Sequence, residues 1–423
     1  MSDRTDTPMR DLGQAGVAPS PSWGRVLGVF ALALAFVVLT RWPVARDAPV
    51  ETDEFGFLET IAAYRMPMHH TLFLASARLI GNAIGDPYRG FIVLDMVVSA
   101  LALTSAWWWL RALVRPATAT AAVALLAVSP LFWAYGALAG NYTAIPLVGC
   151  FLLGIAVRTY ADPRPWHPYA AALALALGTG YRQDIGTFWL PVFFVILWPH
   201  RWKAAIGPLV VFTLVNLAWL GGMVADVGWA HYREASAEFA HEAGYRNSFW
   251  NLGVRDAPLR YAVKLTMALA WTLGPALLFV PRGISRTRWP LVALLALSVV
   301  PALGFHLFVH FGVPGYSFHD LPALLALVAL GIGRIPSAQG IATRSDQAPA
   351  RLACVALVMA ALFLAYPTNY KRGGLWGDFD IAFARLTRVG LKIPRPDRTP
   401  AAWPTAVTRP LAGDLLPGGR LAN

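Results

Sequence analysis

Two adjacent carboxylates are the clearest candidates for chemistry in this sequence. Asp53 and Glu54 follow the first long apolar stretch of the chain. Neighbouring acids at a membrane surface can act as a general base with its positioning partner, or can bind a hard cation through their oxygens. A solvated acidic loop is the simpler alternative, because two acids in a row are common. The pair is therefore a candidate catalytic centre whose surroundings must support it.

A cation and an anion interrupt two short apolar stretches further along the chain. Residues 178–184 (GTGYRQD) place Arg182 and Asp184 two positions apart. An ionisable pair at a membrane boundary is costly unless its members are paired or functional. The Arg182 guanidinium can bind a phosphate through two parallel hydrogen bonds while Asp184 holds the side chain in place. The alternative is a pair that only closes a helical turn.

The segment 310–322 (HFGVPGYSFHDLP) gathers a third set of polar side chains. Its Gly and Pro residues favour tight turns, and Tyr316, His319 and Asp320 then project polar groups at the membrane boundary. A zinc site that joins His310 to His319 and Asp320 is an alternative with weak support, because the spacing is not the i, i+4 spacing of a helical metal site.

Two histidines open a short apolar segment in the first polar region. His69 and His70 begin the segment 69–84, which also contains Arg78. A spanning helix needs about 20 apolar residues, so this segment is predicted to lie in the interface as an amphipathic helix. The two histidines then either donate hydrogen bonds to a phosphate or anchor the helix.

Three polar residues beside apolar stretches have structural interpretations. Asn141 and Tyr142 are interpreted as a pocket edge or a helix cap. Asp95 lies inside an apolar stretch, and we expect it to pair with a polar group on another membrane helix, because an unpaired carboxylate at that depth is costly.

The elements that position these residues are predicted to be membrane helices. The chain has 423 residues, of which 57% are hydrophobic and 14% charged, against about 25% charged in soluble proteins. This composition excludes an ordinary soluble enzyme. Apolar windows bounded by charge or by Pro and Gly predict about eleven spans, at 24–40, 90–110, 117–137, 142–158, 168–181, 185–199, 204–224, 260–280, 289–309, 318–334 and 352–367.

The distribution of Lys and Arg predicts the orientation. A cytoplasmic N-terminus places the Arg-rich connections on the inner side, whereas the outer connections 138–141 and 310–317 contain no Lys or Arg. This asymmetry follows the positive-inside rule. The net charge of +12 is therefore assigned to the cytoplasmic side of a membrane, and no nucleic-acid partner is expected.

The predicted fold class is an all-α polytopic membrane protein with an amphipathic interfacial helix in the first outer loop. Residues 1–23 are predicted to be a disordered cytoplasmic leader, and 24–367 a transmembrane catalytic domain. Its large outer loops are 41–88 and 225–259, and 368–423 form an outer tail. No internal or inverted repeat is visible, which counts against many transporter folds.

The order of these motifs resembles the GT-C superfamily of membrane glycosyltransferases, in particular the branch of protein O-mannosyltransferases and aminoarabinose transferases. The resemblance covers about residues 24–335 and lies on the Asp53-Glu54 pair, on residues 178–184 and on the Gly-Tyr element of 310–322. Relatives carry Lys or His followed by two prolines at the position where this chain reads His69-His70-Thr71-Leu72.

The resemblance implies a transferase that uses a polyprenyl-phosphate-linked sugar at the outer, periplasmic face of the inner membrane. It implies that Asp53 is the general base of an inverting displacement and that Glu54 orients it or binds a divalent cation; no other cofactor is expected. A lipid, glycan or protein supplies the acceptor hydroxyl, and the protein contacts membrane lipids. The donor phosphate and substrate are expected to contact His69, His70, Arg182, Asp184, Tyr316, His319 and Asp320.

Two alternatives use the same residues differently. A polytopic transporter or lipid-linked-sugar flippase would arrange the acids and Arg182 along a translocation path, with repeated bundles around a site at the membrane midplane. A catalytically silent scaffold would present the 225–259 loop and the tail to a partner. A transferase should instead place Asp53, Arg182 and the 310–320 loop together at the outer boundary.

Overall fold

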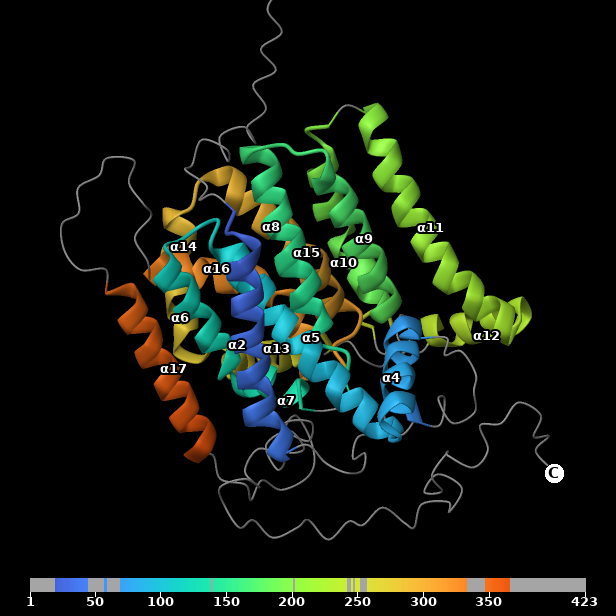
Figure 1. Cartoon of the computed structure of the whole chain (residues 1–423), viewed down its shortest axis with the longest axis horizontal. Helices are drawn as coiled ribbons and strands as arrows, with labels where there is room; N and C mark the ends of the chain where they lie inside the picture. Colours follow the sequence, from blue (N-terminus) through green and yellow to red (C-terminus); the bar gives the residue numbers. More distant parts are fainter. Residues whose placement is uncertain are drawn as a thin grey trace, which may run out of the picture.

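The computed structural model describes residues 20–44, 57–58, 69–137, 140–200, 202–241, 245, 248–251, 257–332 and 347–365. All secondary structure in these ranges is helical (Figure 1). Asp53 and Glu54, most of the predicted leader and the whole predicted tail lie outside the described residues.

The described helices match the predicted all-α polytopic fold. Six segments of the described chain are long and apolar enough to cross a membrane. They are α2 (Trp23–Arg41), α5 (Pro87–Leu110), α8 (Ala144–Ala161), most of α11 (Trp202–Val227), the segment Pro258–Arg286, and α15 (Trp289–Phe308). The other predicted spans correspond to shorter helices, namely α6 (Pro116–Ala127), α9 (Trp166–Tyr181), α10 (Gln183–Leu197), α16 (Leu321–Ile332) and α17 (Ala348–Ala365).

Two predicted spans are interrupted, one at a proline and one at a glycine with positive φ. The span 117–137 divides into α6 and α7 (Pro130–Tyr135), because Pro130 lacks the N–H needed to continue α6 and Ser129 caps the new helix. The span 260–280 divides into α13 (Ala257–Leu273) and η4 (Gly274–Phe279) at Gly274, whose φ is +50°. The connection that follows contains a further helix, α14 (Val280–Arg286).

The predicted interfacial helix is α4 (Thr71–Ile84), which packs on α5 at the lower end of the bundle in Figure 1. It buries Phe73, Leu74 and Ala77, whereas Leu79 on its other side is exposed. The second surface helix, α12 (Trp229–Phe239), follows α11 at the same end of the bundle (Figure 1). The position of α4 agrees with the interfacial helix predicted for residues 69–84.

One end of the bundle collects the polar connections, and we call it the polar end. The helices α2 and α9 end there, and α8, α10 and α16 begin there. The short helix η5 (Pro314–His319) lies between α15 and α16 at this end and packs against α8. The chain thus brings segments from 41 to 320 together at one depth.

Glycine allows α4 to approach α5 closely, and this contact fixes where the histidines at the start of α4 lie. A Cβ atom on Gly90 would approach the backbone nitrogen of Gly81 to 2.6 Å, whereas one on Gly28 of α2 has nothing within 4 Å. Backbone atoms cannot move aside as a flexible side chain can.

We therefore predict that Gly90→Ala destabilises the protein by about 1–3 kcal/mol, whereas Gly28→Ala does not. Thermal unfolding of the purified variants in detergent measures both effects, and equal midpoints would show that this contact does not constrain α4.

Candidate functional site

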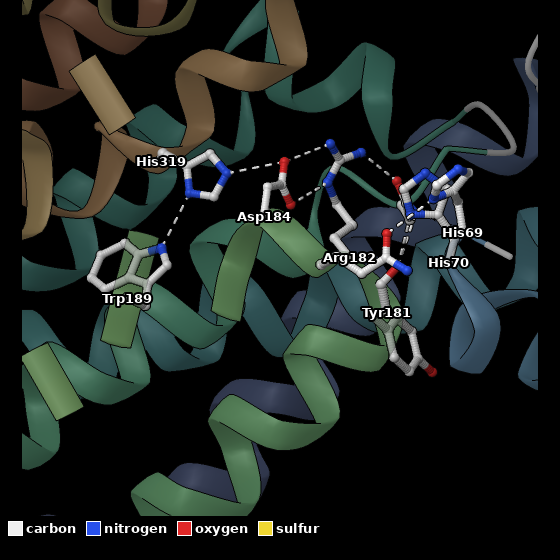
Figure 2. A network of polar contacts seen from close by, with 9 residues as sticks. His69, His70, Tyr181, Arg182, Asp184, Trp189 and His319 are labelled. Atoms are coloured by element: carbon white, nitrogen blue, oxygen red, sulfur yellow. Dashed lines mark hydrogen bonds and ion pairs between the residues drawn. The ribbon is translucent and has the colours of Figure 1, made fainter. Parts of the chain in front are cut away.

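The site is centred on Arg182, which lies in the break between α9 and α10. The backbone is extended at this residue (φ −150°, ψ 120°), and its side chain is only 3% exposed. Nε and Nη2 donate to the two carboxylate oxygens of Asp184 at 3.1 and 2.8 Å, and Nη1 donates to Asn141 Oδ1 at 2.6 Å (Figure 2). The guanidinium is therefore held in a fixed plane by two neighbours.

Two tyrosine rings flank this guanidinium. The Arg182 Cζ atom lies 4.1 Å from the ring centroid of Tyr142 and 5.3 Å from that of Tyr316. Cation–π attraction of this kind strengthens when the pair is removed from water. A guanidinium has five N–H groups. Among the described residues, Arg182 uses three of them in its hydrogen bonds to Asp184 and Asn141, and two are left for a further acceptor.

Asp184 also faces a histidine whose protonation the structure defines. His319 Nε2 lies 3.4 Å from Asp184 Oδ2, and Trp189 Nε1 donates to His319 Nδ1 at 3.2 Å (Figure 2). An indole N–H is only a donor, so Nδ1 must accept and the proton must be on Nε2. His319 is thus a neutral ring whose Nε2 lies beside the Asp184 carboxylate.

The two histidines at the start of α4 support the same break from the other side. His70 Nδ1 donates to the Tyr181 carbonyl at 3.2 Å, and His69 Nδ1 lies 3.1 Å from Gln183 Oε1. The backbone of His70 is left-handed, with φ +60°. Burial lowers the pKa of His70 to about 3, and the positive charge of Arg182 adds to this effect. His70 is therefore neutral at physiological pH and acts as a hydrogen-bond donor.

The structure brings together most of the residues that the sequence identified. His69, His70, Arg182, Asp184, Tyr316 and His319 form one connected cluster at the polar end. Asp320 is buried beside His319, but no described group donates a hydrogen bond to its carboxylate. Asp53 and Glu54 lie outside the described residues, so their places in the site stay a prediction.

The zinc alternative is wrong for the part of the chain that the structure describes. His310 packs against the rings of Tyr316 and Tyr261. No group of three or more His, Cys, Asp or Glu side chains that could hold a metal occurs among the described residues.

Two members of the cluster were not assigned to it from sequence. Asn141 was expected at a pocket edge or helix cap, and it accepts directly from Arg182. Trp189 carried no signal beyond being an aromatic residue in an apolar helix, yet its indole fixes the tautomer of His319. Only the contact between distant helices shows these roles.

Comparison with known proteins supports the fold class. No family model matches the chain, and no curated protein sequence matches it. Among solved structures, the crystal structure of ArnT from Cupriavidus metallidurans bound to undecaprenyl phosphate matches with a TM-score of 0.61 at 14% identity, over 87% of this chain and 70% of that one. Its apo crystal structure matches with a TM-score of 0.52 at 13% identity, over 73% of this chain and 59% of that one.

The likeness shows that this chain shares the fold of these two ArnT structures. The polytopic helical bundle and the interfacial helix of the first loop, both expected from the sequence, therefore belong to a known membrane fold. At this level of identity the comparison shows the fold, and the chemistry must be argued from the residues of this chain.

Burial of neutral His70 makes a prediction about pH. Its pKa of about 3 lies below the usual value of 6.5, so the unfolded chain binds a proton that the folded protein does not as the pH falls below about 6.5. Folding stability should therefore decrease toward acidic pH, and His70→Gln should lose less stability than the wild type between pH 7 and pH 5. His231→Gln on the exposed side of α12 is the control, since that ring contacts solvent in both states. Unfolding midpoints at both pH values test this, and an equal loss in wild type and His70→Gln would contradict it.

Proposed function

We propose that the protein is a glycosyltransferase that moves a sugar from a polyprenyl-phosphate-linked donor to an acceptor hydroxyl, with inversion at the anomeric carbon. The reaction takes place at the outer face of the cytoplasmic membrane. The acceptor is a lipid, a glycan or a protein. The ArnT structure with the higher TM-score holds undecaprenyl phosphate, and the same GT-C architecture in this chain supports a lipid-phosphate partner.

The observation that carries this proposal is the immobilised guanidinium of Arg182. It is buried at the polar end, is aligned by Asp184 and Asn141, and retains two N–H groups after its contacts with the described residues. A planar fork of donors in a water-poor setting matches the oxygens of a phosphate. Apolar helices surround this end, so a prenyl chain can remain in lipid while its phosphate reaches the arginine.

The depth of the cluster favours a transferase over a transporter. Substrate sites of secondary transporters lie near the membrane midplane, between repeated bundles. In this chain Arg182, Asn141 and His319 all lie where helices begin or end. A cluster at one boundary suits a reaction between a membrane-bound donor and an acceptor from outside.

The proposed reaction is a single displacement. Asp53 accepts the proton of the acceptor hydroxyl as its oxygen bonds to the anomeric carbon, and Glu54 orients Asp53 or binds a cation. The bond between the anomeric carbon and the phosphate oxygen breaks, and polyprenyl phosphate leaves. Arg182 stabilises the negative charge that develops on that oxygen, with His69 and Tyr316 as neighbouring donors.

Substitution of Arg182 by Lys tests the phosphate site. Lys keeps the charge opposite Asp184 but loses the planar fork, so we predict at least about tenfold weaker binding of undecaprenyl phosphate. Arg164→Lys is a matched control, because Arg164 also pairs with an aspartate two residues away, at 2.7 Å, but is exposed and precedes α9 at the opposite end of the bundle. Native mass spectrometry of the purified proteins with undecaprenyl phosphate gives the affinities. Unchanged binding in a folded Arg182→Lys protein would remove the basis of the proposal.

Substitution of Asp53 by Asn tests the general base. Loss of a general base lowers rates by about 10²–10⁴-fold, so Asp53→Asn should insert and fold normally but fail to transfer sugar. Mass spectrometry of membrane lipids measures this, because a lipid-linked sugar should accumulate when the gene is deleted. The wild-type gene should clear it and Asp53→Asn should not, while Asp47→Asn in the same outer loop serves as the control. Full clearance by Asp53→Asn would show that this acid is not the base.

A further inference from the structure

Asp95 is a buried carboxylate that the proposed mechanism does not use. It lies on α5 with no exposed surface. Its Oδ2 accepts the backbone N–H of Gly140 at 2.7 Å, and its Oδ1 accepts the hydroxyl of Thr143 at 3.5 Å. Both donors belong to residues 140–143, which immediately precede α8. Asp95 therefore ties α5 to that segment.

The same segment holds the guanidinium of Arg182. Asn141, between the two donors to Asp95, accepts from Arg182 Nη1 and donates its own Nδ2–H to the Tyr181 carbonyl at 3.0 Å. The adjacent Tyr142 presents its ring to the guanidinium. The segment 140–143 contacts both Asp95 and Arg182, so a shift of this segment moves two of the groups that surround the arginine.

Arg41 supplies a counter-charge for Asp95. Its guanidinium lies at the end of α2, fully buried, with Cζ 5.2 Å from the ring centroid of Phe132. Gly136 leaves the space for it, because a Cβ atom there would collide with Arg41 Nη1. The three side-chain nitrogens of Arg41 have no hydrogen-bond partner among the described residues, and the opposite charge that acts on it is Asp95. Because a buried cation is strongly unfavourable without a compensating anion, Asp95 on the neighbouring helix α5 is the acid assigned here as the compensating charge for Arg41.

We propose that Asp95 is a positioning residue for Arg182, acting through its hydrogen bonds to residues 140–143. The inference rests on the proposed function, in which Arg182 binds the donor phosphate. The required feature is an acceptor oxygen at position 95, and Arg41 makes a charged acceptor tolerable at that depth. Small displacements of a group that binds a substrate cost large factors in its effectiveness.

Two double variants separate the acceptor from the charge. Arg41→Met with Asp95→Leu removes both charges and the acceptor, whereas Arg41→Met with Asp95→Asn removes both charges but keeps an oxygen for the Gly140 N–H. Neither leaves a lone buried charge, so folding should survive. We expect the Leu variant to bind undecaprenyl phosphate at least about tenfold more weakly than the Asn variant. Hydrogen exchange of the amides of 140–143 should also be faster in the Leu variant.

Ser105→Ala is the control for a merely structural effect. Ser105 Oγ donates to the Leu147 carbonyl at 3.0 Å across the same α5–α8 contact, away from residues 140–143. Its loss should leave both the affinity and the exchange of 140–143 near wild type. Thr143→Val keeps the size of the side chain and both buried charges but removes one hydrogen-bond donor to Asp95. It should increase the hydrogen-exchange rate of the amides of 140–143.

Two outcomes overturn the inference. The first is that the two double variants bind undecaprenyl phosphate with equal affinity. The second is that the amides of 140–143 exchange hydrogen at the wild-type rate in both Thr143→Val and the Leu variant. Failure of the proposed function is recognised separately, because wild type and Arg182→Lys would then bind undecaprenyl phosphate alike, whatever happens at position 95.

Discussion

Burial of the Arg182 guanidinium is the constraint on which the rest of the polar end depends. A charge removed from water is tolerated only where opposite charge and hydrogen bonds replace the solvent. Asp184 supplies the charge, Asn141 supplies an acceptor, and the rings of Tyr142 and Tyr316 lie within cation–π distance of the guanidinium. These partners come from three segments, namely 140–143, the start of α10 and η5, so the arginine lies where these segments meet.

The partners of Arg182 are themselves oriented by further contacts. Trp189 fixes the proton of His319, which faces Asp184, and His70 donates to the carbonyl of Tyr181 beside the arginine. This arrangement holds the guanidinium still before any ligand arrives. A preorganised donor needs no rearrangement when charge develops on a leaving group, and electrostatic stabilisation of that kind is a large contribution to catalysis.

Local sequence patterns predicted the helices, but they predicted neither the interruptions at Pro130 and Gly274 nor all contacts between helices. Apolar windows identified the membrane helices, and the charged motif at 182–184 identified the centre of the site. The division at Pro130 is caused by a proline within a predicted span. A single proline has little effect on the mean hydropathy of a window of residues, so this division was not predicted. The roles of Asn141 and Trp189 were beyond prediction, because each depends on a partner tens of residues away in the chain. Asp95 was expected to pair with a polar group on another membrane helix, and its donors proved to be in the segment just before α8, with Arg41 of α2 as the counter-charge.

An experimental structure of the protein with undecaprenyl phosphate tests the central claim most directly. The account predicts a phosphate oxygen within about 3 Å of Arg182 Nη1 or Nη2, with the Tyr142 and Tyr316 rings still flanking the guanidinium and the Asp184 contact intact. It also predicts that the first outer loop brings Asp53 within about one sugar length of that phosphate. A phosphate bound away from Arg182, or an Asp53 carboxylate directed away from the lipid, would contradict it.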